Sequence, residues 1–255
     1  MEERLNKWLS QMGVCSRREA DRLIEAGKVL VDNRPASMGQ KVTPGQKVVC
    51  NGKMVRVDRS QRPRPVLLAV NKPKGIVCTT TDKDRAENIV DFLGYPERIY
   101  PVGRLDKDSE GLLLMTNQGD LVNKIMRSGN AHEKEYIVTI DKPVTERFLE
   151  QMAGGIRLPE LDQVTRPCKV KKVERNTFSI ILTQGLNRQI RRMCQACGCR
   201  VRTLKRVRIM NIVLGDLKPG EYRKVEGEEL EMLRSLAGET RKKQTGEAKY
   251  ERDRK

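Results

Sequence analysis

The chain of 255 residues is long enough for one large domain or two smaller ones. It carries 51 Lys and Arg against 34 Asp and Glu, a net charge of +17, and a balance this basic points to a polyanionic partner, with nucleic acid as the first candidate. No stretch is apolar enough to predict a membrane span or a signal peptide, so we expect a cytoplasmic protein with no membrane partner.

The seven cysteines have no spacing typical of a disulfide framework and fit reduced thiols. Cys194, Cys197 and Cys199 are close enough in sequence to suggest zinc, but no fourth ligand is near them and the single histidine, His132, is distant in the sequence. We therefore expect no metal and interpret these cysteines as small buried hydrophobic residues.

The first segment predicts two helices followed by a small sheet. Apolar residues at helical spacing mark the first helix: Leu5, Trp8, Leu9 and Met12. Ser16 to Glu19 form a capping box for a second helix, which Gly27 ends. Val29–Val31 and Val42–Cys50 read as strands, and Asn51-Gly52 is a strong hairpin signal.

Basic side chains crowd around these helices: Arg4, Lys7, Arg17, Arg18, Arg22 and Lys28. Such a face suits phosphates, although exposed Arg and Lys often do no more than solvate a helix surface. The stretch RLNKWLSQMGVCSRREADRLIEAGKVLVDN resembles an S4 domain, a small RNA-binding fold. The resemblance implies that residues 1–58 form an S4 RNA-binding domain, with Arg17, Arg18 and Lys28 at the RNA.

Residues 59–65 are polar and punctuated by proline, which is typical of a linker. A second domain is predicted over residues 66–237, and the basic tail 238–255 has almost nothing apolar, so we expect it to be disordered. The second domain begins with predicted strands at Val66–Val70 and Ile76–Cys78, separated by an Asn-Lys-Pro-Lys-Gly turn.

A charged turn lies between two apolar runs in the stretch RIYPVGRLDKDSEGLLLMT, residues 98–116. The apolar residues on its two sides predict buried strands: Ile99, Tyr100 and Val102 before it, and Leu112, Leu113, Leu114 and Met115 after it. Arg104, Asp106 and Asp108 in the turn need partners unless the turn is exposed. The alternative is an ordinary surface turn in which Arg104 pairs with Asp108.

The elements that follow predict an α+β domain whose sheet is mostly antiparallel and flanked by helices. The expected helices are Asp120–Met126, Thr145–Met152 and Glu228–Leu236, and the expected strands are Tyr136–Ile140, Lys169–Val173 and Thr177–Thr183.

A basic stretch spans Asn187 to Met210 and contains no acidic residue. Its eight charges are Arg188, Arg191, Arg192, Arg200, Arg202, Lys205, Arg206 and Arg208. Like charges this dense repel one another unless solvent or a phosphate backbone compensates them, which favours a groove for nucleic acid.

Three motifs resemble those of the pseudouridine synthases: G-R-L-D-x-D-S-x-G-L-L, K-E-Y and N-R-Q-I-R-R-M. The N-K-P-x-G turn also recurs in that family. With an S4 domain in front, the chain is most similar to the RsuA/RluB/RluF group of ribosomal RNA pseudouridine synthases, and within it to the RluF type. The resemblance implies that Asp106 is catalytic, that Tyr136 packs against the target base, and that Arg191 pairs with Asp106 next to the apolar Ile190. We add Arg104, Arg188 and Arg192 to the predicted substrate-binding residues.

The implied reaction detaches uracil from C1′ of the ribose, rotates it and reattaches it through carbon. Nothing is oxidised, reduced or hydrolysed, so we expect no cofactor. A carboxylate can stabilise or trap positive charge at the sugar carbon, or act as a base on the sugar, and the sequence leaves both routes open. A flat aromatic ring such as that of Tyr136 would hold the unstacked base.

Two other functions compete with this reading. An RNA-binding or ribosome-assembly factor would need only the S4 domain and the charge, but it leaves Asp106, Tyr136 and Arg191 without a joint purpose. A base deaminase is excluded because the H-x-E and P-C-x-x-C zinc signature is missing. We expect a monomer that acts on large-subunit (23S) ribosomal RNA or its precursor, with small-subunit or transfer RNA as alternatives.

Overall fold

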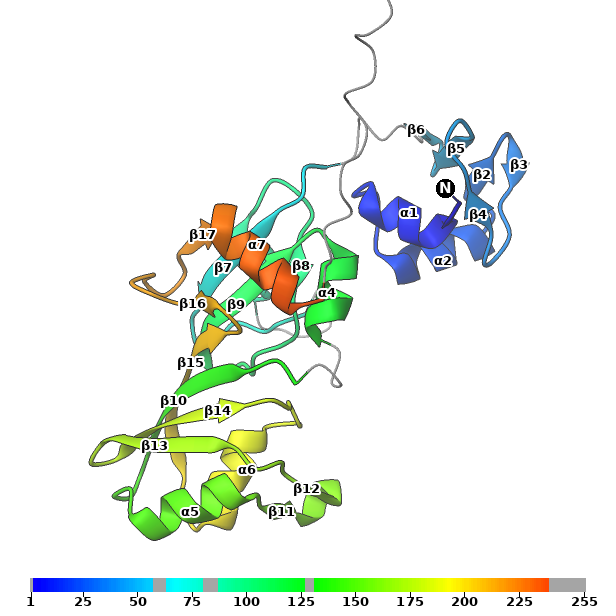
Figure 1. Cartoon of the computed structure of the whole chain (residues 1–255). Coiled ribbons are helices and arrows are strands. Elements are labelled where there is room, and N and C mark those ends of the chain that lie inside the picture. Colours follow the sequence, from blue (N-terminus) through cyan, green and yellow to red (C-terminus); the bar gives the residue numbers. More distant parts are fainter. Residues whose placement is uncertain (1, 57–62, 80–86, 127–130, 239–255) are drawn as a thin grey trace, which may run out of the picture.

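A computed structural model describes residues 2–56, 63–79, 87–126 and 131–238 (Figure 1). Most of the predicted linker and nearly all of the predicted tail lie outside these ranges, so the domain boundaries remain predictions. Within the described ranges, no helix is both long and apolar enough to cross a bilayer.

The N-terminal unit packs two helices, α1 (Leu5–Gln11) and α2 (Arg17–Glu25), against short strands. The strands are β1 (Glu3–Arg4), β2 (Val29–Val31), β3 (Arg34–Pro35), β4 (Lys41–Val42), β5 (Lys47–Cys50) and β6 (Lys53–Arg56). Strands β3, β2, β5 and β6 form an antiparallel sheet in that order, and β1 pairs with β4. Both predicted helices and the hairpin at Asn51-Gly52 are confirmed.

Two details of this unit differ from the expectation. The predicted strand Val42–Cys50 is interrupted by a turn at residues 43–46, which contains a proline and a glycine. Ser16 does cap α2, since its hydroxyl accepts the backbone N–H of Glu19 at 3.1 Å, but the Glu19 carboxylate pairs with Arg22 instead of returning to close a capping box.

The larger unit is built on one twisted sheet of nine strands in the described residues. Its strands are β7 (Leu67–Lys72), β8 (Tyr100–Pro101), β9 (Glu110–Thr116), β10 (Lys134–Ile140), β13 (Lys169–Glu174), β14 (Thr177–Leu182), β15 (Val201–Ile209), β16 (Ile212–Val213) and β17 (Tyr222–Lys224). The main order is β13-β14-β10-β15-β9-β7-β17, and only β15 and β9 are parallel. The predicted α+β class with a mostly antiparallel sheet is confirmed.

One half of this sheet, centred on β7 and β9, is buried on both faces, as the continuous apolar runs predict. Helices α4 (Gly119–Met126) and α7 (Gly227–Leu236) cover one face, and α3 (Ile89–Leu93) covers the other. Two expectations here are wrong in extent. Residues 76–78 form only an isolated bridge, from Val77 to Asn88, and the strand before the charged turn is reduced to the two residues of β8.

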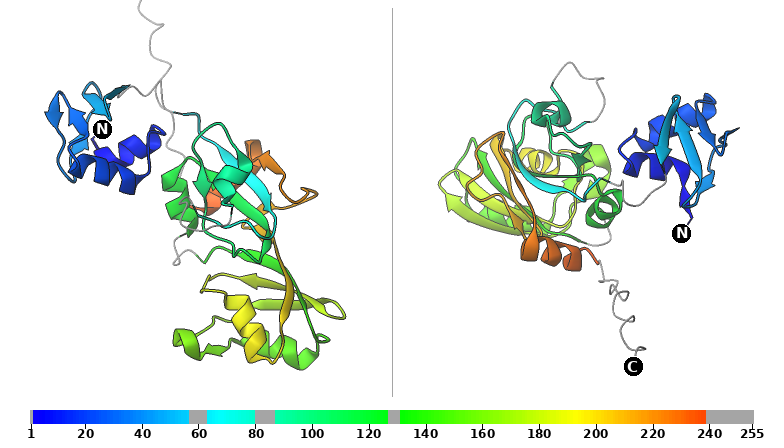
Figure 2. Two further views of the ribbon diagram at one scale, coloured as in Figure 1. Left: turned by 180° about the vertical axis from the view of Figure 1, so that it is seen from behind. Right: turned by 90° about the horizontal axis from the view of Figure 1, so that it is seen from above.

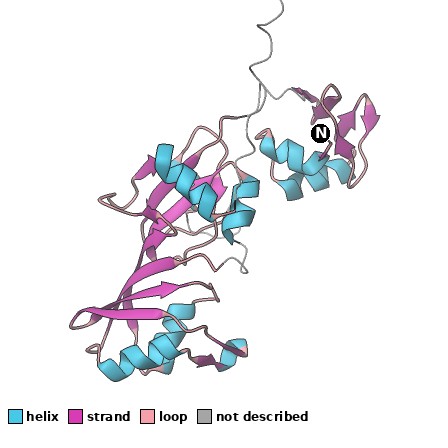
Figure 3. Cartoon of the chain, viewed as in Figure 1, coloured by secondary structure: helices cyan, strands magenta, loops and turns pink. Residues whose placement is uncertain are grey.

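The other half is covered on one face by α5 (Glu146–Gly154) and α6 (Gln189–Ala196), which lie side by side in Figure 3. A small hairpin of β11 (Arg157–Leu158) and β12 (Gln163–Val164), joined through the 3₁₀ turn Pro159–Leu161, lies next to α6. The two halves meet where β15 runs beside β9. Gly111 is required at this junction, because a Cβ there would overlap the backbone carbonyl of Arg206.

The N-terminal unit stands beside the larger one, as the views in Figures 1 and 2 show. Lys7 on α1 forms an ion pair with Asp120 at the start of α4, with an N–O distance of 2.9 Å. A longer hydrogen bond, 3.4 Å, runs from Arg98 to the hydroxyl of Ser10.

Candidate active site

Asp106 lies in a tight turn between β8 and β9, as the sequence predicts. The backbone N–H of Ser109 donates to the carbonyl of Asp106 at 3.0 Å, and the N–H of Gly75 donates to the carbonyl of Lys107 at 2.8 Å. Ser109 is fully buried, whereas the Asp106 side chain retains 37% of its exposure. The buried side of the turn is therefore anchored, while the carboxylate of Asp106 faces open space.

Lys72, for which the sequence indicates no role, supports this turn from the neighbouring strand. Its side chain is fully buried, and its ammonium group donates to the carbonyls of Pro73 (2.8 Å) and Ile76 (2.9 Å). Burial lowers the pKa of Lys72. The amine thus closes the Asn-Lys-Pro-Lys-Gly turn, and Gly75 of that turn holds the Asp106 turn in place.

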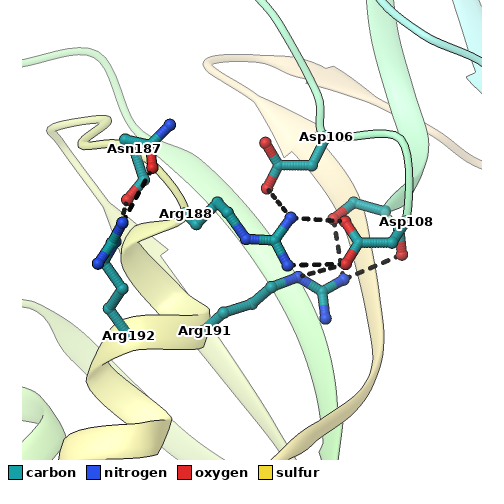
Figure 4. Close-up of polar contacts among 7 residues, drawn as sticks. Asp106, Asp108, Asn187, Arg188, Arg191 and Arg192 are labelled. Atoms are coloured by element: carbon teal, nitrogen blue, oxygen red, sulfur yellow. Dashed lines mark hydrogen bonds and ion pairs between the residues drawn. The ribbon is translucent and has the colours of Figure 1, made fainter.

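Two arginines from the start of α6 meet the aspartate turn (Figure 4). Arg188 donates two hydrogen bonds to the Asp108 carboxylate, at 3.1 and 2.9 Å. Arg191 places Nε 3.3 Å from the same carboxylate and donates to the Asp108 carbonyl (2.9 Å) and the Ser109 hydroxyl (3.2 Å). We call Asp106, Asp108, Ser109, Arg188 and Arg191 together the paired wall.

The pairing within the paired wall differs from both sequence-based expectations. The ion pair of Asp106 is with Arg188, at 4.0 Å, while Arg191 pairs with Asp108. The alternative pair of Arg104 with Asp108 is also replaced, since the two helix arginines occupy that carboxylate. Arg188 directly precedes α6 in a left-handed backbone conformation, and Arg191 lies in the first turn of that helix. Both side chains therefore reach the aspartate turn from the N-terminal end of α6.

The Asp108 carboxylate is held in its charged form. Burial acts to raise the pKa of Asp108, but the hydrogen bond from Arg188 and the charge of Arg191 outweigh it and leave this pKa below its ordinary value. The hydrogen bond to Asp108 also raises the pKa of Arg188. The paired wall is therefore locally compensated.

The basic stretch 187–210 is not the uncompensated groove that the sequence predicts. Besides the pairs to Asp108, Arg192 pairs with Glu160 at 2.6 Å, and Arg208 with both Glu133 (3.0 Å) and Glu135 (2.8 Å). These acids come from distant parts of the chain, so no local charge count could reveal them. Arg200 and Arg202 remain exposed and can contact a phosphate backbone.

A cavity of about 590 Å³ opens beside Asp106, within the size range of ligand sites. The predicted residues that line it are Arg104, Asp106, Tyr136, Arg188, Ile190 and Arg191. Its base is formed by the side chains of Lys134, Tyr136, Leu204 and Arg206 on β10 and β15, which we call the sheet floor. The structure thus brings Asp106, Tyr136 and Ile190 to one cavity, whereas Arg192 lies beside it in its pair with Glu160.

Lys134 and Arg206 are the site residues that sequence reasoning missed. The sequence places Arg206 among the backbone-binding charges, yet this residue is only 3% exposed. The available signal was the strand alternation, because Arg206 lies two positions from the buried Leu204 on the same face of β15.

Two further groups of predicted residues lie away from the cavity. Arg17, Arg18 and Lys28 are exposed on the N-terminal unit. Cys194 and Cys199 are buried in the apolar cluster beneath α6, and burial raises the pKa of the Cys194 thiol. Among the described residues, no group of three or more His, Cys, Asp or Glu side chains is arranged to hold a metal ion.

Comparison with known proteins adds independent information. A family model described as RNA pseudouridylate synthase matches residues 66–196, and an S4 domain model matches residues 3–48. The chain is 52% identical over 227 residues to the dual-specificity RNA pseudouridine synthase RluF of Escherichia coli strain K12, covering 89% of this chain and 77% of that protein.

Two other similarities extend over nearly the whole chain. The ribosomal large subunit pseudouridine synthase B of Bacillus subtilis strain 168 is 36% identical over 243 residues, covering 92% of this chain and 97% of that protein. A crystal structure of a pseudouridylate synthase superimposes with a TM-score of 0.66 at 28% identity, covering 91% of this chain and 99% of that one.

Proposed function

The chain belongs to the RNA pseudouridine synthase family and carries an N-terminal S4 domain; from this premise we propose that it converts specific uridines of large-subunit ribosomal RNA to pseudouridine, with Asp106 as the catalytic carboxylate. The observation that carries the proposal is that Asp106 and Tyr136 line one cavity, although 30 positions separate them in sequence. A carboxylate that faces open space beside an aromatic side chain suits a reaction at C1′ of a nucleotide whose base has left its stack.

The residues of the cavity fit separate tasks in this reaction. Asp106 acts on the sugar, as nucleophile at C1′ or as base at C2′, while Tyr136 and Ile190 hold the uracil. Arg191 keeps the aspartate turn in place through Asp108 and Ser109, and Arg188 supplies the positive charge opposite Asp106. Within the proposed mechanism, these groups need no cofactor to complete an isomerisation.

The proposed substrate class rests on the names of the relatives and on the exposed basic residues of the S4 domain. The Bacillus subtilis relative is named for the large ribosomal subunit, and the Escherichia coli relative is named as dual-specificity, so we propose a main site in large-subunit RNA and a second, minor RNA target. The exposed Arg17, Arg18 and Lys28 would anchor the RNA backbone at the S4 domain. We propose that the enzyme works in the cytoplasm as a monomer.

The test is incubation of the protein with ribosomal and transfer RNA transcripts labelled with tritium at C5 of uridine. Formation of pseudouridine releases this tritium, whereas binding alone or attack at another ring position retains it. We expect release from a large-subunit stem-loop and little from small-subunit RNA. Release only from small-subunit RNA contradicts the substrate proposal, and no release from any RNA contradicts the activity.

The contribution of the S4 domain is measured separately through salt. Replacement of Arg17, Arg18 and Lys28 by Gln should weaken RNA binding and lower the log–log salt slope by about 0.7 to 0.9 for each phosphate that the protein no longer neutralises. The single-turnover rate at saturating protein should not change. An unchanged slope would show that these three side chains do not bind the RNA backbone.

A further inference from the structure

Arg206 is a buried guanidinium without a charge partner. It is 3% exposed, and no carboxylate of the described residues lies within 4.0 Å of it. Its Nε donates to the carbonyl of Leu112 at 2.7 Å and one Nη donates to the carbonyl of Arg104 at 3.5 Å, while Nη2 is buried without any hydrogen-bond partner. Because burial of an unpaired charge is costly, a residue in this state calls for an explanation.

The position of Arg206 gives that explanation. It lies directly opposite Tyr136 in the pairing of β15 with β10, at a point where the register shifts. Opposite residues of an antiparallel pair project from the same face, and both Arg206 and Tyr136, the residue proposed to hold the base, line the cavity. Its bond to the Arg104 carbonyl also brings it close to the turn that carries Asp106.

Lys134 reinforces this positive region. It lies two residues before Tyr136 on β10 and lines the same cavity, and its ammonium group donates only to the carbonyl of His132, at 3.2 Å, within the described part of the chain. Burial and the charge of Arg206 both lower the pKa of Lys134. The sheet floor thus holds two cations that lack a carboxylate, beside a wall where acids and arginines compensate one another.

The reaction creates an anion at this place. In both routes open to Asp106, the C1′–N1 bond breaks and its electron pair leaves with the uracil, whose negative charge spreads over N1, O2 and O4. On the sugar, either Asp106 forms a bond to C1′, or it takes the C2′ proton and a C1′–C2′ double bond forms. C5 of the rotated base then bonds to C1′, Asp106 is released or returns its proton, C5 loses a proton and N1 gains one.

We propose that Arg206, assisted by Lys134, donates to a carbonyl oxygen of the flipped uracil and stabilises the negative charge of the base while it is detached. A fixed, buried cation interacts far more strongly with a nearby anion than a cation in bulk solvent does, and it needs no reorganisation when the bond breaks. The same hydrogen bond retains the loose base during its rotation. This inference rests on the proposed function, because it assumes that uracil occupies the cavity.

The inference is tested by making the leaving base intrinsically more stable. Fluorine at C5 withdraws electrons and stabilises the uracil anion, so an enzyme that lacks its own stabilising cation gains more from it. We expect Arg206→Gln to slow single-turnover consumption of uridine by about a hundredfold, as for removal of one transition-state donor. With 5-fluorouridine RNA the effect should shrink to about tenfold, as measured by digestion and mass spectrometry of the remaining nucleoside.

Control variants separate this role from a structural one. Arg223 on β17 is fully paired with Glu229 and lies outside the cavity, so Arg223→Gln should leave both rates unchanged. Lys134→Met should slow the reaction less than Arg206→Gln, and its loss of rate should also shrink with 5-fluorouridine RNA. If Arg206→Gln fails to fold, Lys134→Met provides the test. The proposal is wrong if each variant loses the same factor of rate with 5-fluorouridine RNA as with uridine RNA. It is also wrong if the variants lower RNA affinity and leave the single-turnover rate unchanged.

Failure of this inference differs from failure of the proposed function. If the wild-type protein consumes neither RNA, or if Asp106→Asn retains activity, the assignment of the reaction or of its catalytic residue falls. The wild-type protein could be active and Asp106→Asn inactive, while the ratio of the rates with 5-fluorouridine and uridine RNA is the same in the Arg206 and Lys134 variants as in the wild type. That result would contradict only the role of Arg206 and Lys134.

Discussion

The paired wall and the sheet floor enclose the same cavity but treat charge in opposite ways. On the wall, Asp108 accepts from Arg188 and Arg191, so the loop is fixed before any RNA arrives. On the floor, Arg206 and Lys134 have only carbonyl partners among the described residues. The difference indicates that the paired wall positions the aspartate turn, whereas the sheet floor suits a ligand that carries negative charge.

The largest effect should come from Asp106, the carboxylate of the paired wall that faces the cavity. We expect Asp106→Asn to abolish tritium release, because an amide can neither attack C1′ nor accept a proton from the sugar. RNA affinity should stay within about threefold, since the carboxylate makes no favourable interaction with phosphates. Substantial turnover in this variant would assign the chemistry to another residue.

A second variant tests whether the wall positions the turn. Arg191→Gln removes the interactions with Asp108 and Ser109, so the aspartate turn should shift and the single-turnover rate should fall by about a hundredfold. Arg192→Gln, on the same helix but paired with Glu160, is the matched control and should stay within about threefold of the wild type. Equal losses of rate in the two variants would mean that the rate depends on the positive charge of α6 and not on the position of the aspartate turn.

A smaller effect should come from the apolar part of the floor. Tyr136→Leu removes the ring and should lower the single-turnover rate by about tenfold, the order expected for removal of one stacking partner of a base. Tyr136→Phe keeps the ring and should remain close to the wild type. A large loss of rate in the Phe variant would instead give the hydroxyl a chemical role.

The smallest expected effect is on stability and concerns His132, which lines the cavity beside Lys134. Burial, and less strongly the charge of Lys134, lower the pKa of His132 below its ordinary value of 6.5. The unfolded chain therefore takes up the proton first as the pH falls, so folding is destabilised below about pH 6.5 until the lower folded pKa is reached.

This effect is measured by urea unfolding at about pH 7.5 and about pH 5.5. His132 is the only histidine of the chain, so His132→Asn should lose less stability over this interval than the wild type. Parallel losses of stability in the two proteins would show that the surroundings of His132 impose no cost on a protonated imidazole.

Much of the fold could be predicted from local patterns. The 3.6-residue spacing indicated α1, and the cap at Ser16 and Gly27 bounded α2, because these signals depend on neighbours a few residues away. The buried strands β7 and β9 followed from continuous apolar runs. Strand ends were less well predicted. Residues 76–78 pair through one isolated bridge only, and the strand expected before the charged turn pairs with β9 over the two residues of β8.

The sequence by itself identified the family and the proposed site residues Asp106 and Tyr136, because these residues stand in motifs whose order is visible without any structure. Tertiary structure alone decided which charges meet: Asp108 takes both helix arginines, Glu133 and Glu135 take Arg208, and Arg206 is left buried on the floor. The physical reason is that the chain order sets which side chains exist, whereas ion pairing and burial depend on distances between segments some 70 to 100 residues apart, which only the packed sheet fixes.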